Sequence, residues 1–387
     1  MRPKAFASRT MVLCYLFFAY QVISGFLGGN GYDITIWSAR FLGMAIPLII
    51  STVLFSPKFI QDCRGVSKYA LVISFITIIL SIRILINDGN ALRVTSLANS
   101  MGDWDVLYKY WRQGLASYDM AAMMMLMPVV LIFRLKSNVK GNERWLLWIG
   151  IITILVFMYL GQVTATFIIC IMVTLMSFLN VKNRMATFIG IGLIALLLIT
   201  QFTSLMEFAI SSTGDTEMNE KFVAMAGVAE GEALDESTDA GVRWMLVSKT
   251  INSFISYPLF GNSTAPIGGH NYFLDILARY GIIGCLPLFL LIINQYKVIT
   301  SYLLEETKRY YLIIMIGFIV LGIIKNLSGT EYWNYLFIYY PAMLVWFDSK
   351  KRKKVYLIRF DSKNQNKKSN KQRSKFGLHI NRKIFQS

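Results

Sequence analysis

The residue best suited to acid–base chemistry in this chain is His270. It is one of only two histidines, and it lies in Gly268-Gly269-His270-Asn271, directly before a long apolar segment. An imidazole titrates near neutral pH and can take a proton from a hydroxyl group. We treat His270 as a candidate general base, against the alternative that a lone histidine is structural. Asn271 is a candidate helix N-cap, and we group it with the substrate-binding residues because the glycines before it allow a close approach of the backbone.

Four cationic side chains stand near the ends of apolar segments, where charged residues are rare. Each maps near the same end of its segment, the end that the orientation below places outside: Arg40, Arg83, Arg279 and Lys325. A charge at the centre of a bilayer costs about 2.5–3.5 kcal/mol, and less near the interface, so each should have a partner. Arg243 is also unusual, because it falls off the polar stripe of a predicted amphipathic helix.

Two interpretations of these cations remain open. Arginine binds phosphate through parallel hydrogen bonds, so several cations at one membrane level favour a polyanion such as a lipid pyrophosphate. On this interpretation Arg243, Arg40, Arg279 and Arg83 are candidate phosphate ligands. Alternatively the side chains extend to the interface or neutralise acidic neighbours, as Asp275 and Arg279 would at a spacing of i, i+4.

The elements that must position these residues are membrane spans. The chain of 387 residues is 55% hydrophobic and only 16% charged, whereas soluble domains average about 25% charged residues. This composition excludes a soluble domain, a disordered chain and a disulfide-stapled fold. Ten segments approach the roughly 20 residues that cross a bilayer. They are 11–28, 34–55, 69–87, 118–135, 145–161, 163–180, 185–206, 272–295, 310–327 and 334–348.

The distribution of basic residues orients these spans. With both termini inside, 29 of the 39 Lys and Arg residues fall in inner loops or the tail, as the positive-inside rule requires. The sequence thus predicts a polytopic membrane domain over 1–348 and a basic cytoplasmic tail over 349–387. The basic residues behind the net charge of +17 lie mainly in these inner loops and the tail, where they orient the spans, so we expect no nucleic-acid partner. The cysteines form no CxxC or Cys/His cluster, and we expect neither a metal nor another cofactor.

Two predicted outer segments are long, 88–117 and 207–271. The second begins with an acidic stretch that is typical of a solvated loop. From Val242, apolar residues recur at helical spacing until Pro258 ends the pattern. This predicts an amphipathic helix that either lies at the outer interface or packs on the bundle.

Three pieces of sequence in this region occur in the order found in a known superfamily. They are Gly241-Val-Arg243-Trp244, then Tyr257-Pro-Leu-Phe-Gly261, then His270-Asn-Tyr-Phe-Leu-Asp-Ile-Leu-Ala-Arg-Tyr-Gly-Ile-Ile-Gly284. They resemble the O-antigen ligase/polymerase superfamily, which comprises Wzy-type polymerases and WaaL-type ligases. The close match covers about 45 residues. The family often has Ser-Arg early in the sixth span, where this chain has Gly161 to Thr166 without an arginine.

The resemblance implies an all-α integral membrane glycosyltransferase of the GT-C type that uses undecaprenyl-pyrophosphate-linked oligosaccharides as donor and acceptor, without metal. The matching functional positions are Arg243 and His270, and another arginine must replace the missing one. We expect a polymerase of oligosaccharide repeat units for a capsule or O-antigen, in a bacterial cytoplasmic membrane, working beside a flippase and a chain-length regulator. A ligase that transfers finished glycan is the alternative, and a lipid-linked oligosaccharide flippase is a second.

Overall fold

The computed structural model of the chain describes residues 8–27, 34–54, 63–137, 139, 141–161, 164–179, 239–263, 271–325 and 330–348. Several predicted features lie outside the described residues. They are the segment 185–206, the acidic part of the 207–271 loop, His270 and the tail 349–387.

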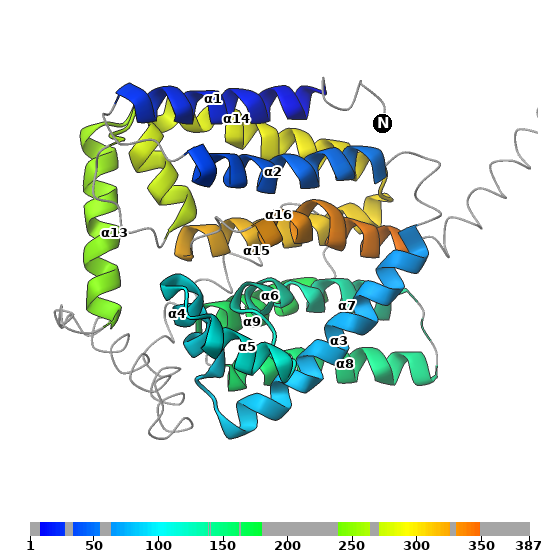
Figure 1. The fold of residues 1–387 in the computed structure, drawn as a ribbon. Helices are drawn as coiled ribbons and strands as arrows, with labels where there is room; N and C mark the ends of the chain where they lie inside the picture. The colour runs from blue at the N-terminus through cyan, green and yellow to red at the C-terminus, as the bar shows by residue number, and fades with distance from the viewer. Residues whose placement is uncertain are drawn as a thin grey trace, which may run out of the picture.

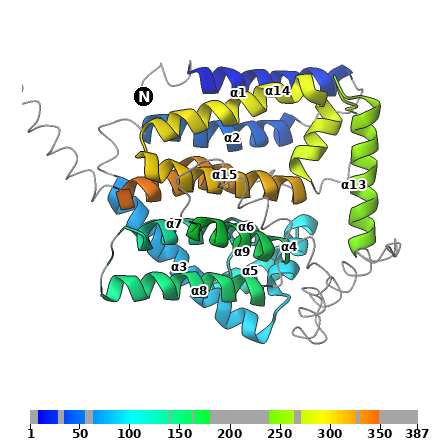
Figure 2. The same ribbon diagram turned by 180° about the vertical axis from the view of Figure 1, so that it is seen from behind.

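Every described secondary-structure element is a helix. The helices are α1 (Arg9–Leu27), α2 (Ile34–Leu54), α3 (Cys63–Asn87), α4 (Ala91–Met101), α5 (Trp104–Arg112), α6 (Tyr118–Met124), α7 (Met127–Leu135), α8 (Asn142–Leu160), α9 (Thr164–Phe178), α13 (Asp239–Ser256), α14 (Tyr272–Ser301), α15 (Glu305–Ile324) and α16 (Thr330–Asn334), followed by a π-helical turn η2 (Tyr335–Tyr339). Most of the long helices run in roughly one direction, with α3 tilted across them (Figure 1; Figure 2). In both views α13 stands crosswise at one end.

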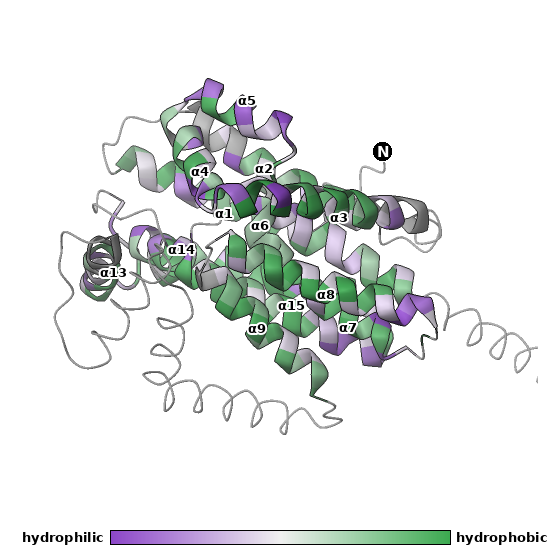
Figure 3. Ribbon diagram, turned by 90° about the horizontal axis from the view of Figure 1, so that it is seen from below, coloured by the Kyte–Doolittle hydropathy of each residue, from purple (hydrophilic) through white to green (hydrophobic). Residues whose placement is uncertain are grey.

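The long helices have the length and composition of membrane spans. Six described helices are long and apolar enough to cross a bilayer: α1, the Ser67–Asn87 part of α3, the α6–α7 pair, α8, α14 and α15. Two shorter apolar stretches lie in α2 and α9. Hydrophobic residues dominate α8, α9 and α15, and hydrophilic ones gather on α5 and near the α7–α8 connection (Figure 3). The prediction of an all-α, multi-pass membrane protein is thus confirmed at this level of detail.

The helix pair α6–α7 forms the centre of the bundle. Buried residues make up 78% of its most apolar 18-residue stretch, against 22% for the corresponding stretch of α3. Each residue from Ala121 to Val130 is buried, and α7 packs against α8, α9 and α15. Since α3 leaves about half of its described apolar residues exposed, α3 forms part of the lipid-facing wall and α6–α7 the core.

The predicted segment 118–135 differs from one continuous helix. It is broken at Met125 and Leu126, and α7 restarts with Pro128 in its first turn, where proline's missing N–H is tolerated. The predicted outer segment 88–117 contains two short helices, α4 and α5. A hydrogen bond from the Tyr110 hydroxyl to Asp88 Oδ2 ties α5 to the end of α3; this bond, with burial as a second cause, raises the pKa of Tyr110.

Candidate functional site

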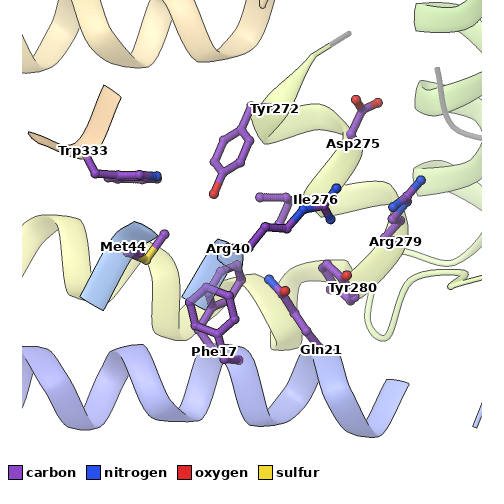
Figure 4. A pocket seen from close by; sticks show the side chains of 11 residues that line it. Phe17, Gln21, Arg40, Met44, Tyr272, Asp275, Ile276, Arg279, Tyr280 and Trp333 are labelled. Atoms are coloured by element: carbon purple, nitrogen blue, oxygen red, sulfur yellow. The ribbon is translucent and has the colours of Figure 1, made fainter. Parts of the chain in front are cut away.

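A pocket of about 140 Å³ lies where α1, α2, α14 and α16 meet. Its polar lining consists of Gln21 from α1, Arg40 from α2, and Asp275 and Arg279 from α14. Aromatic side chains, including Tyr272 and Trp333, complete the wall. Figure 4 shows Arg40 extending from α2 toward the first turns of α14, from which Tyr272, Asp275 and Arg279 project.

The pocket brings together two of the predicted phosphate ligands, Arg40 and Arg279. Their sequence separation is large, and they come to one pocket only because α1, α2, α14 and α16 meet there. The Nε atom of Arg279 is buried and has no hydrogen-bond partner among the described residues. A buried guanidinium N–H without an acceptor is costly, and an anionic group in the pocket would supply one.

Asp275 ties the pocket to two neighbouring elements. Its Oδ2 accepts a hydrogen bond from the backbone N–H of Asn271 at 3.1 Å, which satisfies a free donor at the start of α14. Its Oδ1 accepts a hydrogen bond from the Thr250 hydroxyl of α13 at 3.2 Å. One carboxylate therefore fixes the first turn of α14 and the position of α13 against it.

Asn271 occupies the predicted N-cap position of α14, but its side chain makes no capping hydrogen bond there. With the side-chain amide turned so that its nitrogen faces acceptors, it donates to the carbonyls of Ile323 and Ile324, each at 3.1 Å. The N–H of Tyr272 donates to the carbonyl of Lys325 at 3.1 Å. These bonds give hydrogen-bond donors to the free carbonyls at the end of α15, and they hold the start of α14 against that end.

The two glycine-containing motifs interlock at a kink in α14. Gly281 has φ 63° and ψ −176°, which divides α14 into a short first part and a longer second part. The carbonyls of Pro258 and Leu259 accept hydrogen bonds from Ile282 and Ile283 at 2.9 and 3.1 Å. A Cβ on Gly281 would lie 2.3 Å from the Leu259 carbonyl oxygen, so only glycine fits.

The turn that contains Gly261 is held against α14 in the same way. Gly261 has φ +72°, and a Cβ there would lie 2.4 Å from the Arg279 carbonyl. The N–H of Asn262 donates to the carbonyl of Ala278 at 2.8 Å, which satisfies a carbonyl freed by the kink. The turn after α13 thus fixes the backbone on both sides of Arg279, a pocket residue.

The remaining predicted site residues lie elsewhere or are not described. Arg83 is exposed on α3, whose main neighbour is α8, and it does not line the pocket. Arg243 belongs to α13, but its side chain lies outside the described set, as does the whole of His270.

Lys325 has an acidic partner, as expected for a cation at the level of the membrane. It follows the end of α15 rather than lying inside a span, and its Nζ is 3.7 Å from Asp119 Oδ1. It also lies 3.7 Å above the centre of the Tyr118 ring. Tyr332 donates a hydrogen bond to the same Asp119 oxygen. This group pairs a membrane-level cation with an acidic residue of the same bundle.

Sequence reasoning missed several residues of these sites. Gln21, Tyr272 and Trp333 carry no sequence signal that separates them from other span residues. Asp119 does carry one, because it is an acid in the first turn of an apolar segment and so a natural counter-ion for Lys325. No group of three His, Cys, Asp or Glu side chains suitable for a metal occurs within the described ranges.

The chain matches no protein-family model and no curated protein sequence. The fold therefore defines the class: within the described residues it is all-α, with six helices that are long and apolar enough to span a membrane.

Proposed function

We propose that this protein is a polymerase that joins undecaprenyl-pyrophosphate-linked oligosaccharide repeat units into a surface polysaccharide. The observation that carries the proposal is the pocket in which Arg40 and Arg279 meet, with the Nε of Arg279 buried and lacking a partner among the described residues. Paired arginines at the end of a helix bundle suit the pyrophosphate of a lipid carrier, which lies at the headgroup level.

The location of the pocket supports a lipid-borne substrate. Its lining includes the first turns of α14. This part of α14 lies toward the end of the bundle where α13 stands (Figure 1). A cavity near 140 Å³ is about the size that holds benzene, so it accommodates a headgroup fragment. The oligosaccharide would extend from it toward α13. Arg40 and Arg279 thereby take the role of the arginine missing from the sixth span.

The proposed reaction requires two roles from the protein. The bond between the donor sugar C1 and its pyrophosphate oxygen breaks, while the acceptor hydroxyl oxygen bonds to C1. His270 takes the hydroxyl proton, and the carrier leaves as undecaprenyl pyrophosphate, whose charge Arg40, Arg279 and Arg243 stabilise. No metal is needed, because the leaving group is already activated.

The finer features of the architecture belong to the same proposal. They are ten spans of GT-C type, both termini in the cytoplasm, and residence in a bacterial cytoplasmic membrane. Described helices occupy nine of the ten predicted segments, which supports this count. The interlocked motifs at Gly261 and Gly281 supply a physical reason for the glycines in the family pattern.

A ligase shares the same chemistry and remains the second candidate. A flippase would need cations in the inner half of the bundle as well. Lys136 and Arg309 do lie at the opposite end, but they donate to carbonyls at the end of α9 and just after it, so a structural role explains them.

The test is a His270→Ala variant expressed in place of the wild-type chain. In a polymerase, the variant should accumulate at normal level while carrier-linked single repeat units build up. In a ligase, long polymer should build up on the carrier, because chain growth precedes transfer. Wild-type chain lengths would contradict the role of His270, and a loss of all outward-facing repeat units would favour the flippase.

A further inference from the structure

The exposed side of α13 has two chemically different flanks. Thr250 is buried against α14 and marks the inner side of the helix. At 100° per residue, Ile251 and Ile255 lie on one exposed flank, 39% and 67% exposed. Asn252, Ser256 and Lys249 lie on the other flank, also exposed. A helix at the boundary between lipid and water needs one flank of each kind.

The turn that follows α13 extends the apolar flank. Tyr257, Leu259 and Phe260 are all more than half exposed, although each is large and apolar. The carbonyls of Pro258 and Leu259 in this turn accept hydrogen bonds from the α14 kink, which holds the turn against α14 while these side chains stay exposed. Together with Ile251 and Ile255 they form one exposed apolar surface, which we call the α13 ledge.

The α13 ledge is continuous with the apolar walls of two span helices. The carbonyl of Leu259 accepts a hydrogen bond from the N–H of Ile283. Ile283 begins an exposed apolar row on α14 that continues through Leu286, Leu290 and Ile293. Phe260 accepts a hydrogen bond from Tyr20 of α1, whose next turns expose Ile23, Phe26 and Leu27. Exposed apolar rows on helices of membrane-spanning length face lipid.

The direction of α13 agrees with this continuity. In Figure 1 and Figure 2 it lies crosswise to α1, α14 and α15 at their shared end, and Figure 3 shows it end-on beside the bundle. A helix crosswise to the spans at their end lies in the plane of the membrane surface. We propose that the α13 ledge is buried in the lipid leaflet at that end, at the boundary between headgroups and acyl chains.

Lipid immersion would also steady the pocket. The ledge residues Leu259 and Phe260 belong to the turn whose backbone holds both sides of Arg279. A turn anchored in lipid therefore fixes one pocket wall at headgroup depth. This inference rests on the membrane location of the helices and not on the reaction, so it stands or falls separately from the polymerase.

The test measures collision of spin labels with oxygen, which concentrates in lipid, and with a water-soluble nickel chelate. Single cysteines at Ile255 and Phe260 are labelled in the full-length chain, in vesicles of phosphatidylethanolamine and phosphatidylglycerol. Asn252→Cys is the matched control, three residues from Ile255 on the same helix but on the polar flank. Leu286→Cys gives the lipid reference, and the unsubstituted chain gives the background from its own cysteines.

We expect the labels at Ile255 and Phe260 to collide more with oxygen than with the nickel chelate, as at Leu286. The label at Asn252 should show the reverse. Two results would overturn the proposal. One is a water-like ratio at Ile255 and Phe260, and the other is low collision with both reagents there, which would mean that protein covers the ledge.

Discussion

At the residue scale, the membrane-level cations fall into two groups with different partners. Lys325 is paired with Asp119 and lies over the Tyr118 ring, so its charge is satisfied internally. Arg279 has a buried Nε without a partner among the described residues. The sequence identified these cations from their unusual positions, but which of them converge depends on packing. Arg40 and Arg279 meet in one pocket, whereas Arg83 is exposed on α3.

The first prediction concerns Arg279. Lysine keeps the charge but loses the planar fork, so Arg279→Lys should lower the polymerisation rate about tenfold to hundredfold, the equivalent of one or two charged hydrogen bonds. Arg83→Lys is the matched control and should leave the rate unchanged, because Arg83 does not line the pocket. Both rates are measured with purified protein. Equal effects of the two substitutions would remove Arg279 from the phosphate site.

The second prediction concerns the Lys325–Asp119 pair. Asp119→Asn keeps an acceptor for Tyr332 but removes the counter-charge, and should cost about 1–3 kcal/mol because Asp119 is partly exposed. Adding Lys325→Met should recover part of this loss. Thermal unfolding in detergent measures both variants. Additive losses in the double variant would show that the two charges are not coupled.

At the element scale, the sequence predicted where helices lie but not how they are interrupted. Hydropathy over 118–135 and 272–295 shows that both segments are mostly apolar, but it carries no signal for the break at Met125 or the kink at Gly281. The kink depends on the turn at Pro258 to Gly261, which supplies acceptors to Ile282 and Ile283. Likewise Asn271 sits at its predicted N-cap, but the end of α15 offered its side chain better partners.

The third prediction tests this interlock. Gly281→Ala should destabilise the protein by more than about 3 kcal/mol, because it combines a backbone conformation available essentially only to glycine with a clash against Leu259. Gly102→Ala is the control, since Gly102 also has positive φ but has open space around its Cβ position. It should cost only about 1–2 kcal/mol. Equal shifts in unfolding temperature would mean that the contact with Leu259 contributes nothing.

At the scale of the whole molecule, all the candidate residues must share one face of the membrane. In Figure 1, α4, α5 and α13 lie at one end of the bundle and the α7–α8 connection at the other. These elements are grouped at the two ends as the basic residues predict, while the end that faces the cytoplasm stays a prediction. The sequence could predict it because loop charge is a local property. The pocket is not local, since it combines residues of α1, α2, α14 and α16.

The fourth prediction fixes the orientation of that arrangement. A membrane-impermeant maleimide should label Asp105→Cys in α5 on intact cells and label Asn142→Cys in α8 only after permeabilisation. Both positions are exposed, so access depends on the side of the membrane alone. The unsubstituted chain gives the background. The opposite pattern would place the pocket in the cytoplasm and end the case for a carrier-linked donor.

The central claim is that this chain alone lengthens carrier-linked glycans. The most direct measurement places purified wild-type protein in vesicles with lipid-linked repeat units extracted from cells that lack it, and adds a metal chelator. The account predicts a ladder of longer carrier-linked products that the chelator does not suppress and that His270→Ala fails to form. Repeat units that stay single with the wild-type protein, or a ladder that needs added magnesium, would contradict it.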